Sequence, residues 1–303
     1  MLGSILGAIG QGSIWGVMVL GIFITYKVLK CSDLTVDGSF ATGGAVFAVS
    51  VLAGYPATLA LIFSMLAGCG CGFATGFLHT RCRIPDILAG ILTQLGLYSI
   101  NLRILNDKAN ISIANTSTHI LTISKTLGIT QSRAGLIVGL LVSIICVIIL
   151  YFFLGTEMGA SIRATGNNEK MIRALGVNTE NVKLFGFVIS NMLVALSGAL
   201  LVEMNKYADV GMGKGAIVYG LASIVIGDVL FSKFTNFGIK LLSSVVGCII
   251  FFIIRAIVIR LGLKANDMQL LSSLIVVIAL STPVVKEHFG SKLLLKKDSK
   301  EGK

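Results

Sequence analysis

The sequence predicts an all-α polytopic membrane protein, and three observations carry this prediction. Of the 303 residues, 55% are hydrophobic and only 13% are charged, whereas a soluble domain carries about 25% charged residues. The mean hydropathy is +0.91, and apolar runs long enough for membrane helices recur along the chain. Glycine is abundant at 35 residues, which suits the close packing of membrane helices.

We expect about nine membrane segments, some of them short or broken by polar residues. The first starts at the N-terminus without a basic region or a cleavage signal, so we interpret it as a membrane segment and not as a removable signal peptide. Together the segments form a transmembrane domain over residues 1–285, followed by a basic tail at 286–303. The segments cover residues 2–25, 36–53, 56–79, 86–103, 133–155, 184–204, 215–231, 237–260 and 267–285.

The distribution of Lys and Arg orients these segments, because the cytoplasmic loops of membrane proteins carry an excess of basic residues. With the N-terminus outside, sixteen Lys and Arg fall on the cytoplasmic side and nine on the outer side. Lys214, in the glycine-rich reversal 209–215, is counted among the outer nine. We therefore predict an external N-terminus and a cytoplasmic C-terminus. The net charge of +11 is spread over segment ends, which favours lipid headgroups over nucleic acid as its partner.

Polar residues enter the chain where the second segment begins. The stretch 30–39 contains two carboxylates and three hydroxyl groups. Charged groups deep in hydrocarbon are costly, so they usually face a cavity or a helix end. We interpret the stretch as a broken helix on a substrate pathway. Capping of the next helix near the interface is an alternative that is compatible with it. The candidate pathway residues here are Asp33, Thr35, Asp37, Gly38 and Ser39.

A second set of polar residues lies in the segment 86–103. Gln94, Tyr98 and Asn101 are spaced by four and three residues, so they share one face of a helix. They are candidates for the lining of the same pathway, and Asn191 in the segment 184–204 is a further one. Hydrogen bonding between membrane helices is the other interpretation of each of these residues.

Residues 104–132 form the longest loop on the predicted outer side. The loop is rich in Asn, Ser and Thr and is too polar to insert into a membrane. We consider it either a docking surface for an external partner or a solvated loop without a partner.

Residues 156–183 form a polar island between two apolar segments, on the predicted cytoplasmic side. We expect one short helix in its middle, with Asn167 as the N-cap and Gly176 just after the end. Met171, Ile172 and Leu175 fall on one face of this helix. A solvated loop has no need of an apolar face, so we expect this face to enter the groove of a partner protein.

The chain contains none of the familiar motifs of energy conversion or covalent catalysis. It has no phosphate-binding P-loop, no zinc-protease helix motif and no Gly-x-Ser-x-Gly nucleophile. The six cysteines have no metal-site spacing, and we interpret them as packing residues. We therefore predict a conduit that is neither an enzyme nor a metalloprotein. A stand-alone secondary transporter or channel is one possibility, and a subunit that borrows its energy from a partner is another.

Two stretches carry a resemblance to a known family. One is residues 32–39, SDLTVDGS, with Gly43, and the other runs from GASIRATGNNE at 159–169 through ALGVN at 174–178 to Lys183. They resemble elements of the permease subunits of bacterial ABC importers of the branched-chain amino acid and ribose type, the second being similar to the cytoplasmic loop that engages the ATPase. The order and spacing of the segments match from residue 1 to about 285. Asp37 departs from the usual pattern, and Asp37-Gly38 resembles a subgroup associated with amino-acid uptake, aromatic amino acids included.

The resemblance implies a multi-pass permease in the bacterial inner membrane, with the pathway between two permease subunits. Its implied partners are a second permease subunit, expected to be an identical copy, a cytoplasmic ABC ATPase dimer and an external substrate-binding lipoprotein. This chain would hold no cofactor, because the ATPase binds the ATP. The substrate would be an amino acid, with a sugar or nucleoside as the alternative. The implied ATPase-coupling residues are Arg163, Gly166, Asn167, Asn168, Met171, Ile172, Arg173, Leu175 and Gly176.

Overall fold

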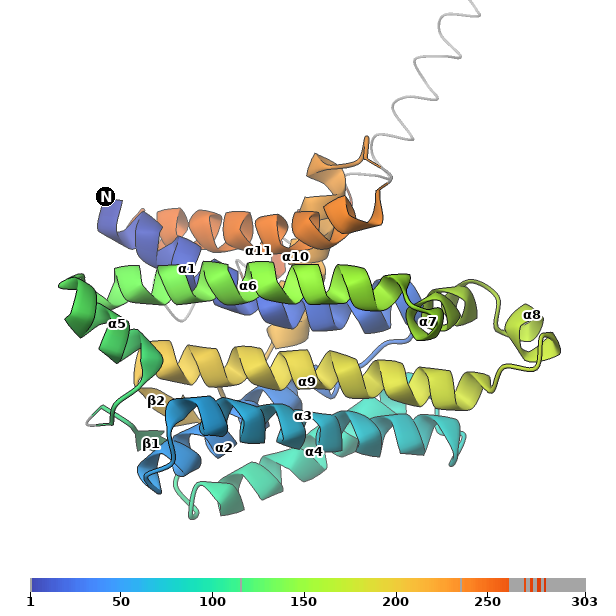
Figure 1. Cartoon of the computed structure of the whole chain (residues 1–303), viewed down its shortest axis with the longest axis horizontal. Coiled ribbons are helices and arrows are strands. Elements are labelled where there is room, and N and C mark those ends of the chain that lie inside the picture. The colour runs from blue at the N-terminus through green and yellow to red at the C-terminus, as the bar shows by residue number, and fades with distance from the viewer. Residues whose placement is uncertain are drawn as a thin grey trace, which may run out of the picture.

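Six helices in the computed structural model are long and apolar enough to cross a membrane, and two further apolar helices are shorter (Figure 1). The structure describes residues 2–114, 116–234 and 236–261, with positions 270, 273, 274, 277, 278 and 281. The six long helical stretches are Gly3–Leu29, Ala57–Thr80, Asp86–Ile104, Gln131–Gly155, Thr179–Asn205 and Phe237–Arg260, and the short helices are Val36–Leu52 and Ala216–Leu230. The prediction of an all-α polytopic fold agrees with this arrangement.

The helices and strands follow one another in a simple order. The first half comprises α1 (Leu2–Ile22), the π-helix η1 (Phe23–Leu29), α2 (Val36–Leu52), α3 (Ala57–Thr80), α4 (Asp86–Ile104), β1 (Asn110–Ser112) and α5 (His119–Leu127). The second half comprises α6 (Gln131–Gly155), α7 (Glu157–Asn167), α8 (Glu169–Ala174), α9 (Thr179–Asn205), β2 (Tyr207–Asp209), α10 (Ala216–Leu230) and α11 (Phe237–Arg260). Eight predicted segments coincide with these helices within a few residues. The ninth, 267–285, and the basic tail lie outside the continuously described ranges.

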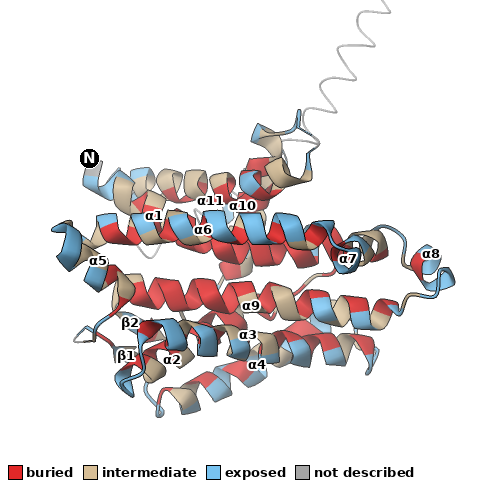
Figure 2. Ribbon diagram, in the orientation of Figure 1, coloured by how far each residue is buried: buried red, intermediate tan, exposed pale blue. Residues whose placement is uncertain are grey.

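Helix α9 lies at the centre of the bundle, packed against α1, α2 and α3. It is buried along most of its length (Figure 2). Two small polar residues on α9 seal its contact with α1, since Ser190 Oγ donates to the carbonyl of Gly21 and Ser197 Oγ to the carbonyl of Ile14, each at 2.8 Å. Such hydrogen bonds between apolar helices satisfy polar groups that hydrocarbon cannot solvate.

The two ends of the bundle differ in structure (Figure 1). One end, here called the sheet end, carries the N-terminus, α5 and the two short strands, and Arg260 there donates a hydrogen bond to Ser4. The opposite end, here called the loop end, carries η1, α7 and α8, and Lys27 there forms an ion pair with Asp228. The charge count predicts that the sheet end is external and the loop end cytoplasmic.

The long loop 104–132 is folded onto the sheet end. The sequence analysis considered it a docking surface or a solvated loop and did not predict this packing. Strand β1 pairs antiparallel with β2, with Asn110 opposite Asp209. Two apolar side chains of the loop, Ile113 and Ile120, are fully buried. The backbone N–H of Ile120 donates to the buried carboxylate of Glu203 at 2.8 Å. The loop is therefore a lid on the bundle, built from a few apolar anchors in a polar sequence.

Candidate functional site

The first long helix breaks at the loop end and the chain then returns into the bundle. The π-helix η1 ends at Leu29 and is followed by Lys30, whose φ of 57° is left-handed. The N–H of Ser32 donates to Asp86 Oδ2 at 2.7 Å, and the N–H of Thr35 donates to Asp33 Oδ1 at 2.9 Å. These bonds satisfy backbone groups that no helix satisfies. The predicted broken helix is thus present, with α2 starting inside the bundle.

Asp33 holds this break against α9. Its Oδ2 accepts from Asn191 Nδ2 at 2.7 Å, and Asn191 Oδ1 accepts from Ser39 Oγ at 2.5 Å. Thr35 shares a hydrogen bond of 2.6 Å with Thr75 of α3. These side chains are at most 3% exposed. The four predicted pathway residues Asp33, Thr35, Ser39 and Asn191 therefore form a closed hydrogen-bonded cluster with Thr75, and they hold the break in place.

Asp37 caps a helix that is distant in sequence. Its Oδ2 accepts from the N–H of Gly215 at 2.9 Å and its Oδ1 from the N–H of Ile217 at 3.1 Å. A carboxylate at a helix N-terminus satisfies free N–H groups and is favoured by the helix dipole. A Cβ atom at Gly213 would lie 1.9 Å from the carbonyl oxygen of Asp37, so the two chains meet where only glycine fits. The sequence also allowed Asp37 to cap a helix, but the expected helix was α2, which contains Asp37, and not α10.

The N-termini of the short helices α2 and α10 thus meet inside the bundle. Asp37 lies about 22 Å along α2 from its end at Leu52, at a helical rise of about 1.5 Å per residue. Since the hydrocarbon core of a bilayer is about 30 Å thick, this meeting point lies well inside it. Broken helices whose N-termini meet at membrane depth are characteristic of substrate sites in transporters.

A cavity of about 170 Å³ opens at this meeting point, here called the central cavity. It brings together five of the predicted pathway residues. Lys214 also lines it, although the charge count assigned this lysine to the outer side. The sequence GMGKG, directly before a short apolar segment, could have pointed to Lys214, because its glycines allow the backbone beside this lysine to pack closely. The residues that line the cavity are Asp37, Gly38, Ala41, Gln94, Leu95, Tyr98, Asn101, Val210 and Lys214.

The polar island at the loop end contains two helices, α7 and α8, where the sequence predicted one. Asn168, and not Asn167, is the N-cap of α8, since its Oδ1 accepts from the N–H of Met171 at 3.1 Å. Asn167 ends α7 and accepts from Lys30 Nζ at 3.3 Å. Gly176 follows α8 with a φ of 85°, as expected for a residue that terminates a helix. The division arises because Thr156 also caps a helix, through the N–H of Gly159.

Of the three apolar residues expected on one face of α8, two are exposed and one is buried. Met171 is 51% exposed and Leu175 is 71% exposed, whereas Ile172 is buried at 7%. Ile172 anchors the short helix to the molecule and is not available to a partner. Helical periodicity alone did not distinguish these residues, because it predicts which residues share a face of the helix and not which of them the rest of the chain buries.

Glu169, which was not a predicted site residue, connects α8 to α9. Its carboxylate accepts from Lys183 Nζ at 2.6 Å and from Arg173 Nη2 at 3.0 Å, and Thr179 Oγ1 donates to it at 3.1 Å. The hydrogen bond from Lys183 lowers the pKa of Glu169 below its ordinary value, so the carboxylate stays charged near neutral pH. Glu169 and Lys183 are fourteen residues apart in sequence, and no helical spacing points to their pairing.

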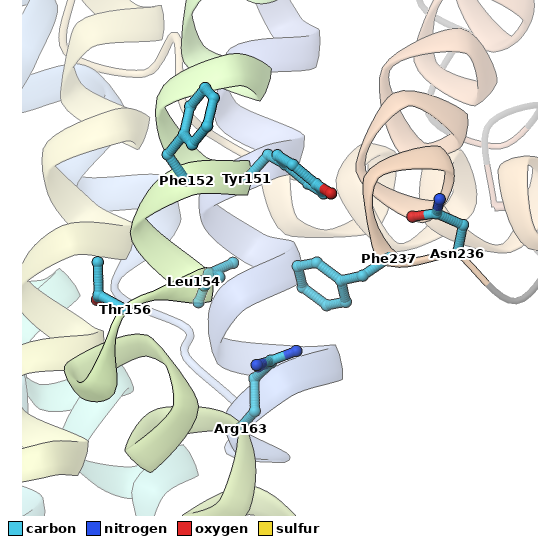
Figure 3. A pocket seen from close by; sticks show the side chains of 8 residues that line it. Tyr151, Phe152, Leu154, Thr156, Arg163, Asn236 and Phe237 are labelled. Atoms are coloured by element: carbon cyan, nitrogen blue, oxygen red, sulfur yellow. The ribbon is translucent and has the colours of Figure 1, made fainter.

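Helix α7 packs directly against η1. A Cβ atom at Gly166 would lie 1.8 Å from the carbonyl oxygen of Val28, so this contact requires a glycine. Arg163 of the same helix stacks over the ring of Phe237 at 5.5 Å from the ring centre. It lines an open cavity of about 430 Å³ between the ends of α6 and α7 and the start of α11 (Figure 3). Arg163 and Gly166 therefore face the membrane helices, while α8 faces outward.

Comparisons with known proteins give a consistent result. A family model described as "Branched-chain amino acid transport system / permease component" matches residues 4–281. A tyrosine transport system permease protein of Clostridioides difficile is 35% identical over 281 residues, or 93% of this chain and 92% of that protein. An uncharacterised protein of Rickettsia prowazekii is 32% identical over 278 residues, or 91% of this chain and 96% of that protein. An autoinducer 2 import system permease protein of Yersinia enterocolitica is 26% identical over 239 residues, or 78% of this chain and 63% of that protein. No solved structure matches the chain.

Proposed function

The chain belongs to the family of permease components of branched-chain amino acid transport systems, and we propose that it forms the pathway of an ATP-driven amino-acid importer. The members of this family are transport permeases and not enzymes. In this proposal a separate ATPase dimer binds α8 at the cytoplasmic loop end, and ATP-driven motion of that dimer switches access to the pathway.

The exposed apolar side chains of α8 are the observation that carries the proposal. Met171 and Leu175 project from the loop end, on a helix that hydrogen bonds and a buried anchor hold in place. Apolar residues of a short helix at such spacing are typical of docking into a groove of a partner protein. A membrane protein that needed no cytoplasmic partner would have no reason to hold these side chains in water.

The contacts around α7 and α8 offer a route for the motion. Glu169 fixes α8 to α9 through Lys183, and α8 follows α7 after the single residue Asn168. Gly166 and Asn167 fix α7 to η1 and Lys30. In this proposal a displacement of α8 moves η1 and the break that follows it. Elements with two discrete packings convert such small displacements into alternating access.

The remaining parts of the proposal concern the substrate, the partners and the orientation. The relative from Clostridioides difficile is named for tyrosine transport, and we assign this chain an amino acid, aromatic ones included. Tyr98 and Lys214 beside the central cavity are exposed, and we place a second copy of the chain over them, so that the pathway lies between two subunits. A substrate-binding protein docks on the sheet end, which faces outward in the inner membrane.

The test is copurification of the ATPase encoded with this permease. Leu175→Asp places a charge on the docking face, so ATPase recovery and ATP-dependent uptake are both expected to fall by at least about tenfold, since a buried unpaired charge costs several kcal/mol. Leu127→Asp is the matched control, because Leu127 is 60% exposed at the opposite end of the molecule. Full ATPase recovery by Leu175→Asp would overturn the proposal, as would uptake by the permease without any ATPase.

A further inference from the structure

Lys214 lines the central cavity with an exposed side chain. It lies between Gly213, which touches the backbone of Asp37, and Gly215, whose N–H the Asp37 carboxylate accepts. Among the described residues no carboxylate forms an ion pair with Lys214. The nearby carboxylate of Asp37 is already bonded through both oxygens to the start of α10. Because this side chain is exposed, its charge is open to a ligand or to a water-filled path.

Asn101 offers a second group without a partner in the same cavity. The residue is 1% exposed, and its Nδ2 donates to the carbonyl of Gly38 at 3.4 Å. Within the described part of the chain its Oδ1 is buried and accepts no hydrogen bond. A buried acceptor left unpaired costs about 1–3 kcal/mol. The central cavity therefore holds a free cation and a free acceptor.

These two groups select the charge pattern of a ligand. An anion would satisfy Lys214 but would bring negative charge beside Asp37 and the Asn101 oxygen. A cation would satisfy Asn101 but would be repelled by Lys214. A molecule with a carboxylate and an ammonium group satisfies both, with charge-assisted hydrogen bonds at each end. Ala41, Leu95 and Val210 supply an apolar wall for its side chain.

We propose that the central cavity is a binding subsite for a zwitterionic α-amino acid. Lys214 pairs with the carboxylate of the amino acid, and Asn101 Oδ1 accepts a hydrogen bond from its ammonium group. Asp37 acts as a positioning residue that holds the start of α10, and with it Lys214, at the end of α2. This inference rests on the proposed function and deepens it, because it gives the permease itself a share in substrate selection.

The test is binding of radiolabelled L-tyrosine and L-leucine to the full-length permease in lipid nanodiscs, without ATPase or binding protein. Lys214→Gln is expected to weaken binding about tenfold or more, the usual loss when a charge-assisted hydrogen bond is removed. Lys214→Arg is expected to retain most of the binding, because it keeps the charge. Lys125→Gln, on α5 outside the cavity, is the matched control and is expected to bind like the wild type. Thermal unfolding of every variant shows whether the bundle is intact.

Competition tests the ligand chemistry independently of any variant. Tyramine lacks the carboxylate and 3-(4-hydroxyphenyl)propionate lacks the ammonium group, so each is expected to compete at least about tenfold more weakly than tyrosine. Equal competition by either analogue, or by ribose, would overturn the inference. The inference would also be overturned if the wild-type permease bound both amino acids no more strongly than Lys214→Gln does. If one of these outcomes occurs but Leu175→Asp still loses ATPase recovery, only the binding subsite is refuted and the proposed function stands. If Leu175→Asp retains full ATPase recovery, the proposed function is refuted.

Discussion

The contact between α7 and η1 leads to a quantitative prediction for Gly166→Ala. The added methyl carbon would lie 1.8 Å from the carbonyl oxygen of Val28 and within 3 Å of two further backbone atoms. Ordinary contact requires at least 3.4 Å, so the two segments must separate by about 1.6 Å, because backbone atoms cannot rotate away. Overpacking of this kind costs about 1–3 kcal/mol. The substitution should therefore open the contact between α7 and η1 while leaving the exposed face of α8 unchanged.

Hydrogen–deuterium exchange of the purified permease measures this opening directly. Peptides that cover residues 23–29 and 157–167 should exchange about 5- to 150-fold faster in Gly166→Ala, the factor that corresponds to about 1–3 kcal/mol. The matched control is Gly155→Ala, because no atom lies within 4 Å of a Cβ atom built at Gly155, and its exchange should match the wild type. ATPase copurification should persist in Gly166→Ala while uptake falls. Unchanged exchange in η1, or full uptake despite faster exchange, would refute the reasoning that α7 acts on η1.

Three further predictions concern the break, the lid and the orientation. Asn191→Leu removes the buried amide that donates to Asp33. It should lower the free energy of unfolding by about 1–3 kcal/mol for each polar group left unpaired, and thermal unfolding measures this loss. The hydrogen bond to Glu203 raises the pKa of His119 above its ordinary 6.5, so the His119–Glu203 pair should hold α5 fully below about pH 6.5 and weaken as the pH rises through the raised value; exchange of residues 119–127 measures this. Cys82, exposed at the loop end, should resist a membrane-impermeant maleimide in intact cells and react after permeabilisation.

Each of these predictions has a contrary outcome. Thr93→Val controls for loss of a partly buried polar group, since Thr93 donates within its own helix to Ala89. Equal destabilisation by both variants would remove the special role of the break. His119→Gln should abolish the pH dependence of α5 exchange, and a persistent dependence would assign it elsewhere. Labelling of Cys82 from outside would reverse the predicted orientation of the whole molecule.

The sequence was sufficient to locate the membrane helices, because runs of about 20 apolar residues have few alternative structures. It also located the break, because carboxylates in such a run need a reason to be there. It did not separate the roles of the two carboxylates. Asp33 pairs with Asn191, 158 residues away, and Asp37 caps a distant helix through Gly215, 178 residues later. Local pattern identifies residues that need a partner, but only the packing of distant segments identifies the partner.

The same limit explains the errors at the two ends of the bundle. Helical periodicity placed Ile172 with Met171 and Leu175, but Ile172 is buried whereas the other two are exposed. The loop 104–132 is polar on average, so its two buried isoleucines, Ile113 and Ile120, had too little weight to predict a folded lid. In both cases a few tertiary contacts override a local average, as is common for short elements.

The length of the connection after η1 decides whether motion at the loop end can reach the central cavity. Lys30 is bound to Asn167 of α7, and Asp33 is bound to Asn191 of α9. Only two residues lie between these two attachment points, and the three residue steps from Lys30 to Asp33 span at most about 10 Å even when fully extended. A flexible loop would absorb a displacement of α7, but a connection this short must transmit it or break one of its attachments. Asp33 is the more strongly held of the two, since its bonds are buried whereas the Lys30 bond is exposed. In the proposed mechanism, a pull from α7 would therefore act on η1 first and would reach α2 only when the buried cluster rearranges.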